Sequence, residues 1–224
     1  MDEEHKISTG SDFFDEMLGG GYESSVVTTI YGPPGSGKTN LCLLCLTKNA
    51  GKKVIYIDTE GSFSVDRIKQ LSPDYEEILK NVIILKPVNF EEQKKVFEKL
   101  KGIVTDRIGL IIVDSIAMLY RLEIGVNKDV FKVNRDLGVQ LVDMVHTARK
   151  FKIPVIITNQ VYSDFEDKSK INIVGGDILK YASKCLIELQ KTDKGKKAIL
   201  RKHRSLPEGK EIDFRIINEG IEKI

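Results

Sequence analysis

The sequence VVTTIYGPPGSGKT at residues 26–39 decides how this chain folds. Its second half matches the GxxxxGK[ST] pattern of a phosphate-binding loop. The apolar, β-branched segment Val26–Ile30 before the loop predicts a strand, and the leucines from Leu41 to Leu46 after it predict a helix. A glycine-rich turn that carries a lysine by chance would not need these neighbours. The stretch therefore indicates a strand, loop and helix that bind a nucleotide.

Each residue type in the loop has a physical role in holding phosphate. Gly35 and Gly37 allow backbone N–H groups to point inward, and the following helix directs the positive end of its dipole at the same place. We expect the Lys38 ammonium to reach the β and γ phosphates and the Thr39 hydroxyl to bind Mg²⁺. The predicted cofactors are thus ATP and Mg²⁺. The predicted contacts to ATP in this stretch are Gly32, Pro33, Pro34, Gly35, Ser36, Gly37, Lys38, Thr39 and Asn40.

Length and composition predict one soluble domain. The chain has 224 residues, of which 41% are hydrophobic and 30% charged, enough for one buried core and too few for two large ones. We expect residues 1–224 to form a single domain. The net charge of +2 means that any surface for nucleic acid must be local. The sequence has no 18-residue apolar run and no signal-peptide pattern, which predicts a cytoplasmic protein without a membrane partner.

The three cysteines cannot all pair within one chain, which favours a reducing compartment. Cys42 and Cys45 form a CxxC, but leucines surround them on the predicted helix after the loop. Buried small hydrophobic residues are the usual occupants of such positions, so we expect no redox or metal role there.

Short apolar runs alternate with helix-period segments along the rest of the chain. This alternation predicts an α/β fold with a mainly parallel central sheet covered by helices. From residue 184 onward, strands separated by polar turns predict a C-terminal antiparallel extension at the sheet edge. The predicted strands are Lys53–Asp58, Val82–Lys86, Leu110–Asp114, Pro154–Asn159, Cys185–Leu189, Ala198–Leu200 and Ile212–Ile217. The predicted helices are Val65–Leu71, Tyr75–Lys80, Phe90–Lys101 and, approximately, residues 129–150.

Asp114 is a further candidate for the nucleotide site. Four apolar residues place it at the carboxyl end of a central strand, where ligands bind in open α/β sheets. We expect it to hold Mg²⁺ through water alongside Thr39, as a Walker B aspartate does. Aspartate at the end of a strand is also common in ordinary α/β proteins, so this assignment depends on the loop.

Several stretches together resemble the RecA/RadA recombinase superfamily. They are STG at residues 8–10, FDEMLGGG at 14–21, YIDTEGSF at 56–63, DS at 114–115 and ITNQV at 157–161. The resemblance covers nearly the whole chain and is closest to the short archaeal RadA paralogues, which consist of the ATPase core. It implies a RecA-like P-loop ATPase core that lacks the N-terminal helical DNA-binding domain of the longer recombinases.

The resemblance implies roles for three further residues near the nucleotide. Glu60 matches the carboxylate that orients or deprotonates the attacking water, and Gln160 matches the residue that senses the γ phosphate and signals to the following DNA-binding loop. With Lys38 they form the expected catalytic set. Arg67 matches an arginine that packs its guanidinium plane on adenine. From the residues alone, all three are also ordinary polar groups at strand ends or on a helix surface.

A basic segment near the C-terminus, KHRSLP at residues 202–207, matches the part that covers the ATP of the neighbouring subunit in filament- and ring-forming relatives. The resemblance implies trans contacts to ATP by Lys202, Arg204 and Pro207, with the two cations acting like an arginine finger. The alternative is a basic strand on a solvated edge, where two-residue alternation places both cations on one face.

Residues 120–135 and 161–176 match the two DNA-binding loops of recombinases. The basic residues of the first are Arg121, Lys128, Lys132 and Arg135. The second contains the acids Asp164, Glu166 and Asp167, the lysines Lys168 and Lys170 and the aromatic residues Tyr162 and Phe165. Three acids against two lysines hold a phosphate backbone poorly, although the aromatic rings offer stacking. We therefore expect DNA binding without strand exchange.

A denser basic cluster lies on the predicted C-terminal hairpin. The residues expected to contact DNA there are Lys191, Lys194, Lys196, Lys197 and Arg201, with Lys202 and Arg204 adjoining. Such a surface would bind DNA in a salt-dependent, sequence-independent way. Lysines on the edge of a sheet also prevent edge-to-edge pairing, so both interpretations stand.

Together these observations predict an ATP- and DNA-binding accessory protein of homologous recombination and DNA repair. We expect weak, DNA-independent ATP hydrolysis, because a single subunit lacks the trans residues and self-assembly is expected to be weak or conditional. The expected partners are single-stranded or branched DNA and either the main RadA-type recombinase or a junction nuclease. Two alternatives remain: a non-enzymatic, ATP-switched scaffold for those proteins, and a KaiC-like regulatory ATPase, although KaiC-like proteins lack the TEGSF and TNQV pair.

Overall fold

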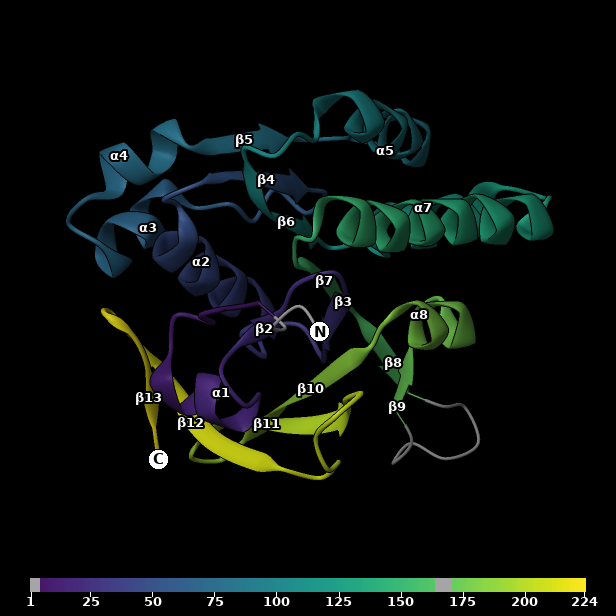
Figure 1. Cartoon of the computed structure of the whole chain (residues 1–224). Coiled ribbons are helices and arrows are strands. Elements are labelled where there is room, and N and C mark those ends of the chain that lie inside the picture. The colour runs from purple at the N-terminus through teal and green to yellow at the C-terminus, as the bar shows by residue number, and fades with distance from the viewer. Residues whose placement is uncertain (1–4, 164–170) are drawn as a thin grey trace.

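The computed structural model describes residues 5–163 and 171–224, and its centre is a nine-stranded sheet with helices on both faces (Figure 1). The strand order is β13-β12-β11-β10-β3-β7-β6-β4-β5. The strands from β10 to β5 in this order pair in parallel, which confirms the predicted α/β class. They are β10 (Cys185–Thr192), β3 (Val27–Tyr31), β7 (Val155–Asn159), β6 (Ile108–Asp114), β4 (Lys53–Asp58) and β5 (Val82–Leu85).

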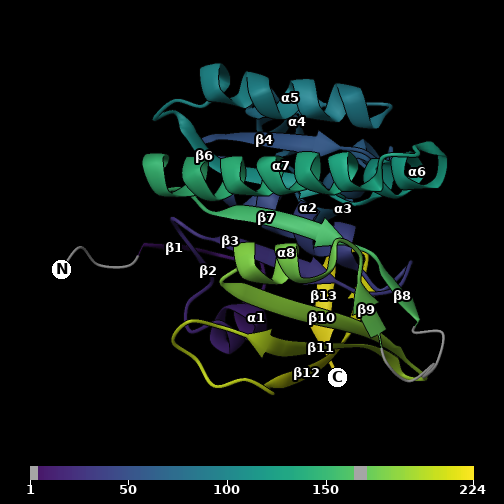
Figure 2. The same cartoon turned by 90° about the vertical axis from the view of Figure 1, so that its right-hand side faces the viewer.

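The side chains of the central strands alternate between two apolar layers. Ile111 and Val113 of β6 belong to the layer under α5 (Phe90–Ile103) and α7 (Val130–Phe151). Leu110 and Ile112 belong to the layer under α2 (Lys38–Asn49), α3 (Val65–Leu71) and α4 (Tyr75–Lys80). The two views show α5 and α7 on one face and α2 and α3 on the other (Figure 2). Burial on both faces explains why these strands have continuous apolar runs instead of alternating ones.

The strand order brings the ends of distant segments together. In the sheet, β7 lies between β3, which leads into the phosphate loop, and β6, which ends in Asp114. Tyr31 is paired with Asn159, and Asp58 with Asp114, so the carboxyl ends of four parallel strands meet at one edge. This edge is where open α/β sheets bind their ligands.

The C-terminal part confirms the predicted antiparallel extension. From β10 the chain returns through β11 (Gly195–Lys202), β12 (Glu211–Ile217) and β13 (Gly220–Lys223), each antiparallel to its neighbour. Three short elements near the N-terminus lie outside the predictions. They are β1 (Lys6–Ile7), α1 (Asp12–Met17) and β2 (Tyr22–Glu23). None of the helices in the described part of the chain is long and apolar enough to cross a membrane.

The assignment of residues 120–135 to a loop is wrong for residues 120–126, which belong to α6 (Met118–Val126), whereas α7 begins at Val130, close to the predicted helix start near residue 129. Buried Leu119 and Tyr120 of α6 pack into the core, and the Asp129 side chain caps α7 by accepting from the Lys132 N–H at 3.0 Å. The other predicted DNA segment begins in β8 (Val161–Ser163), which pairs antiparallel with β9 (Ile171–Ile173) before α8 (Gly176–Ala182).

Candidate functional site

The phosphate loop joins β3 to α2 at the carboxyl edge of the sheet. Gly35 and Gly37 have φ values of +72° and +106°, which L side chains rarely adopt, so both turns require glycine. Lys38 is the first residue of α2, and its Nζ donates to the carbonyl oxygens of Gly32 at 2.9 Å and Pro33 at 3.1 Å. Burial lowers the pKa of Lys38, an effect that a bound anion would oppose.

A cavity of about 260 Å³ lies against this loop. Positive-φ glycines at a helix N-terminus, a buried lysine and a threonine hydroxyl form the donor set that suits a triphosphate with Mg²⁺. Ile216 of β12, which was not predicted from the sequence, adds an apolar side chain to the lining. The cavity is lined by Pro34, Gly35, Gly37, Lys38, Thr39, Asn40, Glu60, Gln160 and Ile216.

Asp114 is buried at the end of β6 and accepts hydrogen bonds from four hydroxyl groups. Thr39 Oγ1 and Tyr56 OH each donate at 2.8 Å and Ser62 Oγ at 3.0 Å, while Thr158 Oγ1 donates to the other carboxylate oxygen. These bonds hold the carboxylate beside Thr39, where the pair fits a Mg²⁺ ion bound directly by the threonine and through water by the aspartate. Burial, followed by the charge of Asp114, raises the pKa of the Tyr56 hydroxyl above its ordinary value.

Glu60 and Gln160, two members of the predicted catalytic set, are in contact. The Glu60 carboxylate accepts from Ser115 Oγ at 2.7 Å and from Gln160 Nε2 at 2.9 Å. Gln160 Oε1 in turn accepts from Arg121 Nη1 at 2.9 Å. The hydrogen bonds made by Ser115 and Arg121 were not predicted, because no pattern in the sequence relates these positions to Glu60 or Gln160. A chain of hydrogen bonds therefore runs from the end of β4, past the end of β7, to α6.

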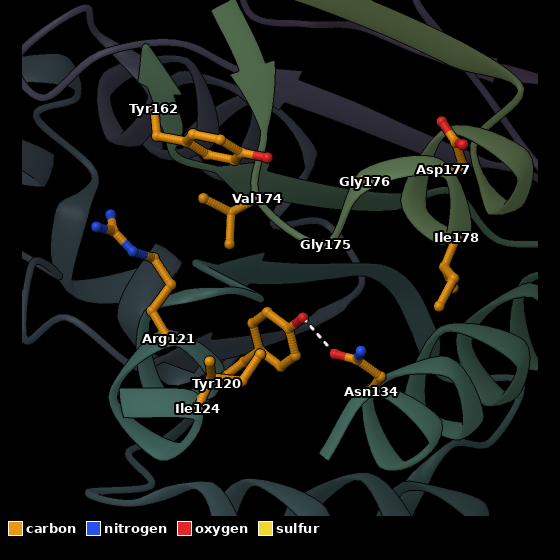
Figure 3. A pocket seen from close by; sticks show the side chains of 10 residues that line it. All are labelled: Tyr120, Arg121, Ile124, Asn134, Tyr162, Val174, Gly175, Gly176, Asp177 and Ile178. Atoms are coloured by element: carbon orange, nitrogen blue, oxygen red, sulfur yellow. Dashed lines mark hydrogen bonds between the residues drawn. The ribbon is translucent and has the colours of Figure 1, made fainter. Parts of the chain in front are cut away.

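A larger cavity of about 500 Å³ has Arg121 in its lining and contains no residue of the phosphate loop among its lining residues (Figure 3). Tyr162 from β8 and Tyr120 from α6 lie on opposite sides of it, and Tyr120 OH donates to Asn134 Oδ1 at 2.7 Å. Both segments predicted to bind DNA contribute to this cavity. Its lining residues are Tyr120, Arg121, Ile124, Asn134, Tyr162, Val174, Gly175, Gly176, Asp177 and Ile178.

The predicted DNA contacts differ in their surroundings. Lys128, between α6 and α7, and Lys132, in the first turn of α7, are both exposed. Arg135, one turn further along α7, pairs with Asp136 at 3.5 Å. On the hairpin, two predicted contacts form ion pairs within the sheet: Lys197 with Glu211 and Arg201 with Glu188, both at 2.6 Å. Lys194 is exposed in the β10–β11 turn, whereas Lys191 and Lys196 lie at the phosphate loop. The second-loop residues Asp164, Phe165, Glu166, Asp167, Lys168 and Lys170 lie outside the described residues.

Arg67 connects α3 to the C-terminal strands. Its guanidinium donates to Asn40 Oδ1 and Gln70 Oε1, both at 2.8 Å, and to three carbonyl oxygens of the β12–β13 turn. Those carbonyls belong to Ile217 at 2.9 Å, Asn218 at 2.9 Å and Gly220 at 3.1 Å. All these bonds lie around the edge of the guanidinium, so stacking of adenine on its face stays a prediction.

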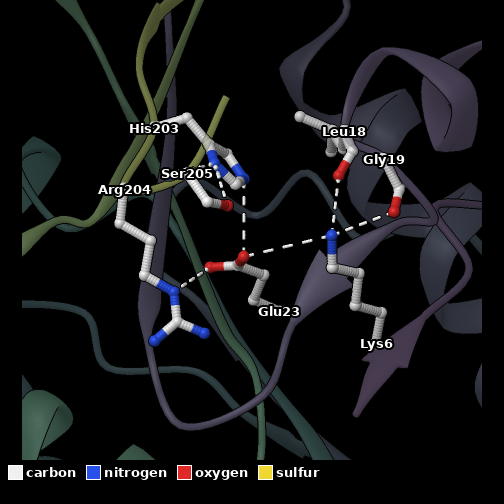
Figure 4. Close-up of polar contacts among 7 residues, drawn as sticks. All are labelled: Lys6, Leu18, Gly19, Glu23, His203, Arg204 and Ser205. Carbon is white, nitrogen blue, oxygen red and sulfur yellow. Dashed lines mark hydrogen bonds and ion pairs between the residues drawn. The ribbon is translucent and has the colours of Figure 1, made fainter. Parts of the chain in front are cut away.

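The two cations predicted to act in trans, Lys202 and Arg204, are bonded within their own chain, and Figure 4 shows the contacts of Arg204. Arg204 Nε donates to the buried carboxylate of Glu23 at 2.8 Å, and His203 Nε2 lies 3.7 Å from the same group. Lys202 Nζ donates to the carbonyl oxygens of Lys180 at 2.7 Å and Ser183 at 2.9 Å. Pro207 is exposed. Contact with a neighbouring subunit's ATP therefore requires these cations to leave their present partners, and it stays a prediction.

The fold and the site together define a RecA-type P-loop core. A phosphate loop follows β3, Asp114 ends β6 on the other side of β7, and the Glu60–Gln160 pair lies at the same edge of the sheet. The chain belongs to the Rad51 family, whose sequence profile matches residues 2–224. This membership places it among DNA repair and recombination proteins and argues against the KaiC-like alternative.

Its relatives match along nearly their whole length. The chain is 46% identical over 215 residues to the DNA repair and recombination protein RadB of Methanococcus maripaludis strain C7, a match that covers 94% of this chain and 97% of that protein. Identity to RadB of Methanobrevibacter smithii is 41% over 234 residues, covering 99% and 97%. The structure also matches a crystal structure of the RadB recombinase with a TM-score of 0.84 at 37% identity, covering 97% of this chain and 99% of that one.

Proposed function

We propose that this chain is an ATP- and DNA-binding accessory protein of homologous recombination that hydrolyses ATP slowly and does not itself exchange strands. The observation that carries the proposal is the hydrogen-bonded chain from Glu60 through Gln160 to Arg121. Glu60 and Gln160 line the nucleotide cavity, whereas Arg121 lines the cavity between the predicted DNA segments. A change in the partners of Gln160 at one site therefore changes the partners of Arg121 at the other.

We expect slow hydrolysis because a single subunit provides only some of the catalytic groups that act on its ATP. The Glu60 carboxylate, which lines the nucleotide cavity, would orient an attacking water, and Lys38 would neutralise charge on the phosphates. Mg²⁺, held by Thr39 and through water by Asp114, would supply further neutralisation. The expected trans cations are retained by other partners, Arg204 by Glu23 and Lys202 by backbone carbonyls. Turnover is then limited by the missing positive charge at the transition state.

DNA binding is assigned to the cavity between α6 and β8. Tyr162 is 46% exposed and offers a ring face for base stacking, and Arg121 offers a phosphate contact. Exposed Lys128 and Lys132 extend the positive surface along the start of α7. The partner in the cell is proposed to be the main recombinase or a junction nuclease.

The coupling between the sites can be measured directly. Single-stranded DNA affinity is determined by fluorescence anisotropy with Mg-ADP and with a non-hydrolysable Mg-ATP analogue, for wild type, Arg121→Ala and Arg135→Ala. We expect the nucleotide to change wild-type affinity by about fivefold or more, a typical coupling energy. Arg121→Ala should abolish that difference while retaining ATP binding. Arg135→Ala, the matched control, should weaken binding equally in both nucleotide states. A nucleotide effect that persists in Arg121→Ala contradicts the proposed connection.

A further inference from the structure

The β10–β11 hairpin reaches the phosphate loop of its own chain. Lys191 of β10 and Lys196 of β11 are directly opposite each other in the antiparallel register. Lys196 Nζ donates to the carbonyl oxygen of Gly35 at 2.8 Å. A Cβ added to Gly37 would lie 3.3 Å from Lys196 Cδ, and one added to Gly35 would lie 3.2 Å from Lys191 Nζ. Both lysines therefore contact the glycines that shape the loop.

These two lysines lack the carboxylate partners that their neighbours have. Lys197 pairs with Glu211 and Arg201 with Glu188, but in the part of the chain that the structure describes neither Lys191 nor Lys196 forms an ion pair. Like charges directly opposite on two strands destabilise a hairpin. After the larger effect of burial, the charge of Lys191 also lowers the pKa of Lys196 and of Lys38, although for Lys38 the charges of Glu60 and Asp114 oppose it more strongly. Three ammonium groups therefore lie at the loop, where a polyanion would reduce their mutual repulsion.

The hydrogen bonds of the loop indicate how the lysines would engage such a ligand. Lys38 and Lys196 each donate to carbonyl oxygens of the loop, Lys38 to Gly32 and Pro33 and Lys196 to Gly35. A phosphate oxygen is a stronger acceptor than a carbonyl oxygen, because the bond is assisted by charge on both sides. Bound phosphates would therefore draw both ammonium groups from the carbonyls to the ligand.

We propose that Lys191 and Lys196 bind the phosphates of ATP in cis, so that this face of the hairpin belongs to the nucleotide site and not to a DNA surface. The inference rests on the proposed ATP binding and adds two residues to it. The two lysines would bind the phosphates equally in the ground state and the transition state, so they would raise ATP affinity without replacing the trans cations Lys202 and Arg204, which are held elsewhere.

The test compares two double variants with the same loss of charge on the same hairpin. Dissociation constants for Mg-ATP and Mg-ADP are measured by titration calorimetry for wild type, Lys191→Ala/Lys196→Ala and the control Lys194→Ala/Lys197→Ala. We expect the first to weaken ATP binding at least about tenfold, and ADP binding less because ADP carries less charge. The control should change either constant less than about twofold. Without nucleotide, the first variant should melt no lower than wild type, since a repulsive pair has been removed.

Each outcome decides one point. If wild type binds ATP, Lys38→Ala does not, and Lys191→Ala/Lys196→Ala binds like wild type, this inference is wrong while the proposed function stands. If wild type binds no ATP, the proposed function itself fails. If Lys191→Ala/Lys196→Ala loses more affinity for nucleotide-free single-stranded DNA than the control variant does, and keeps its ATP affinity, the two lysines are a DNA surface.

Discussion

Asp114 accepts hydrogen bonds from hydroxyl groups on four segments, so it links the phosphate loop to the rest of the sheet edge. Its partners are Thr39, Tyr56, Ser62 and Thr158. A carboxylate can accept all of these bonds at once, whereas an amide presents only one acceptor oxygen. The residue therefore has a structural role in addition to its place beside a Mg²⁺ ion.

We predict that Asp114→Asn lowers the free energy of unfolding by about 1–3 kcal/mol, because hydroxyl groups around the amide lose their acceptor. It should also remove the gain in ATP affinity that Mg²⁺ gives. Chemical denaturation measures the first effect, and ATP titration with Mg²⁺ or with EDTA measures the second. Thr28→Ala, at a buried threonine of β3 away from the carboxyl edge, serves as a control that should retain the Mg²⁺ effect. Unchanged Mg²⁺ dependence in Asp114→Asn would place the metal elsewhere.

The sequence predicted the positions of the candidate nucleotide residues better than it predicted their contacts. The loop spacing and the strand ends placed Lys38, Asp114 and Glu60 correctly at one edge, because local patterns determine where strands end. The contact between Gln160 and Glu60 joins residues 100 positions apart. It depends on how β7 and β4 are arranged in the sheet, and no local pattern encodes that arrangement.

The helices and strands also show that local sequence patterns predict some features of the structure and miss others. The strands and long helices were predicted because periodic apolar residues reveal a buried face. Helix α6 was missed, since its boundaries depend on Leu119 and Tyr120 packing against the core and not on a strong local signal. The function of the β10–β11 hairpin was also incompletely predicted. Consecutive residues of a strand point to opposite faces of the sheet. Lys196 therefore reaches the phosphate loop, while its neighbour Lys197 pairs with Glu211.

Arg67 is predicted to hold the β12–β13 turn against α3. Arg67→Ala should lower the free energy of unfolding by about 1–3 kcal/mol, because three turn carbonyls and Asn40 lose a charged donor. Arg67→Lys should recover little of this, because an ammonium cannot reproduce the planar set of five donors. Urea denaturation monitored by circular dichroism gives both values.

The neighbouring Lys69 provides the matched control for this measurement. Its charge pairs with exposed Asp66 at 3.6 Å on the same helix, and Lys69→Ala should change stability by no more than about 0.5 kcal/mol. If Arg67→Ala is no more destabilising than Lys69→Ala, the turn is held by the apolar contacts of β12 and β13 instead.

In the whole molecule, the hydrogen bonds that link Glu60, Gln160 and Arg121 connect two cavities at the carboxyl edge of one sheet. The nucleotide cavity is lined by residues of its own chain, including Ile216, and Lys191 and Lys196 of the hairpin lie against the glycines of its loop. The cations expected to serve a neighbouring subunit are bonded internally. This arrangement favours a protein that binds ATP as a switch and turns it over slowly by itself.

The most direct test of the accessory role is the rate of ATP hydrolysis by the purified protein without DNA, with single-stranded DNA and with branched DNA, alongside Glu60→Gln. We expect a low rate that is similar in all three conditions and is lost in Glu60→Gln, while the variant still binds ATP. Turnover that DNA stimulates strongly would contradict the accessory role, and turnover that persists in Glu60→Gln would contradict the assignment of the site.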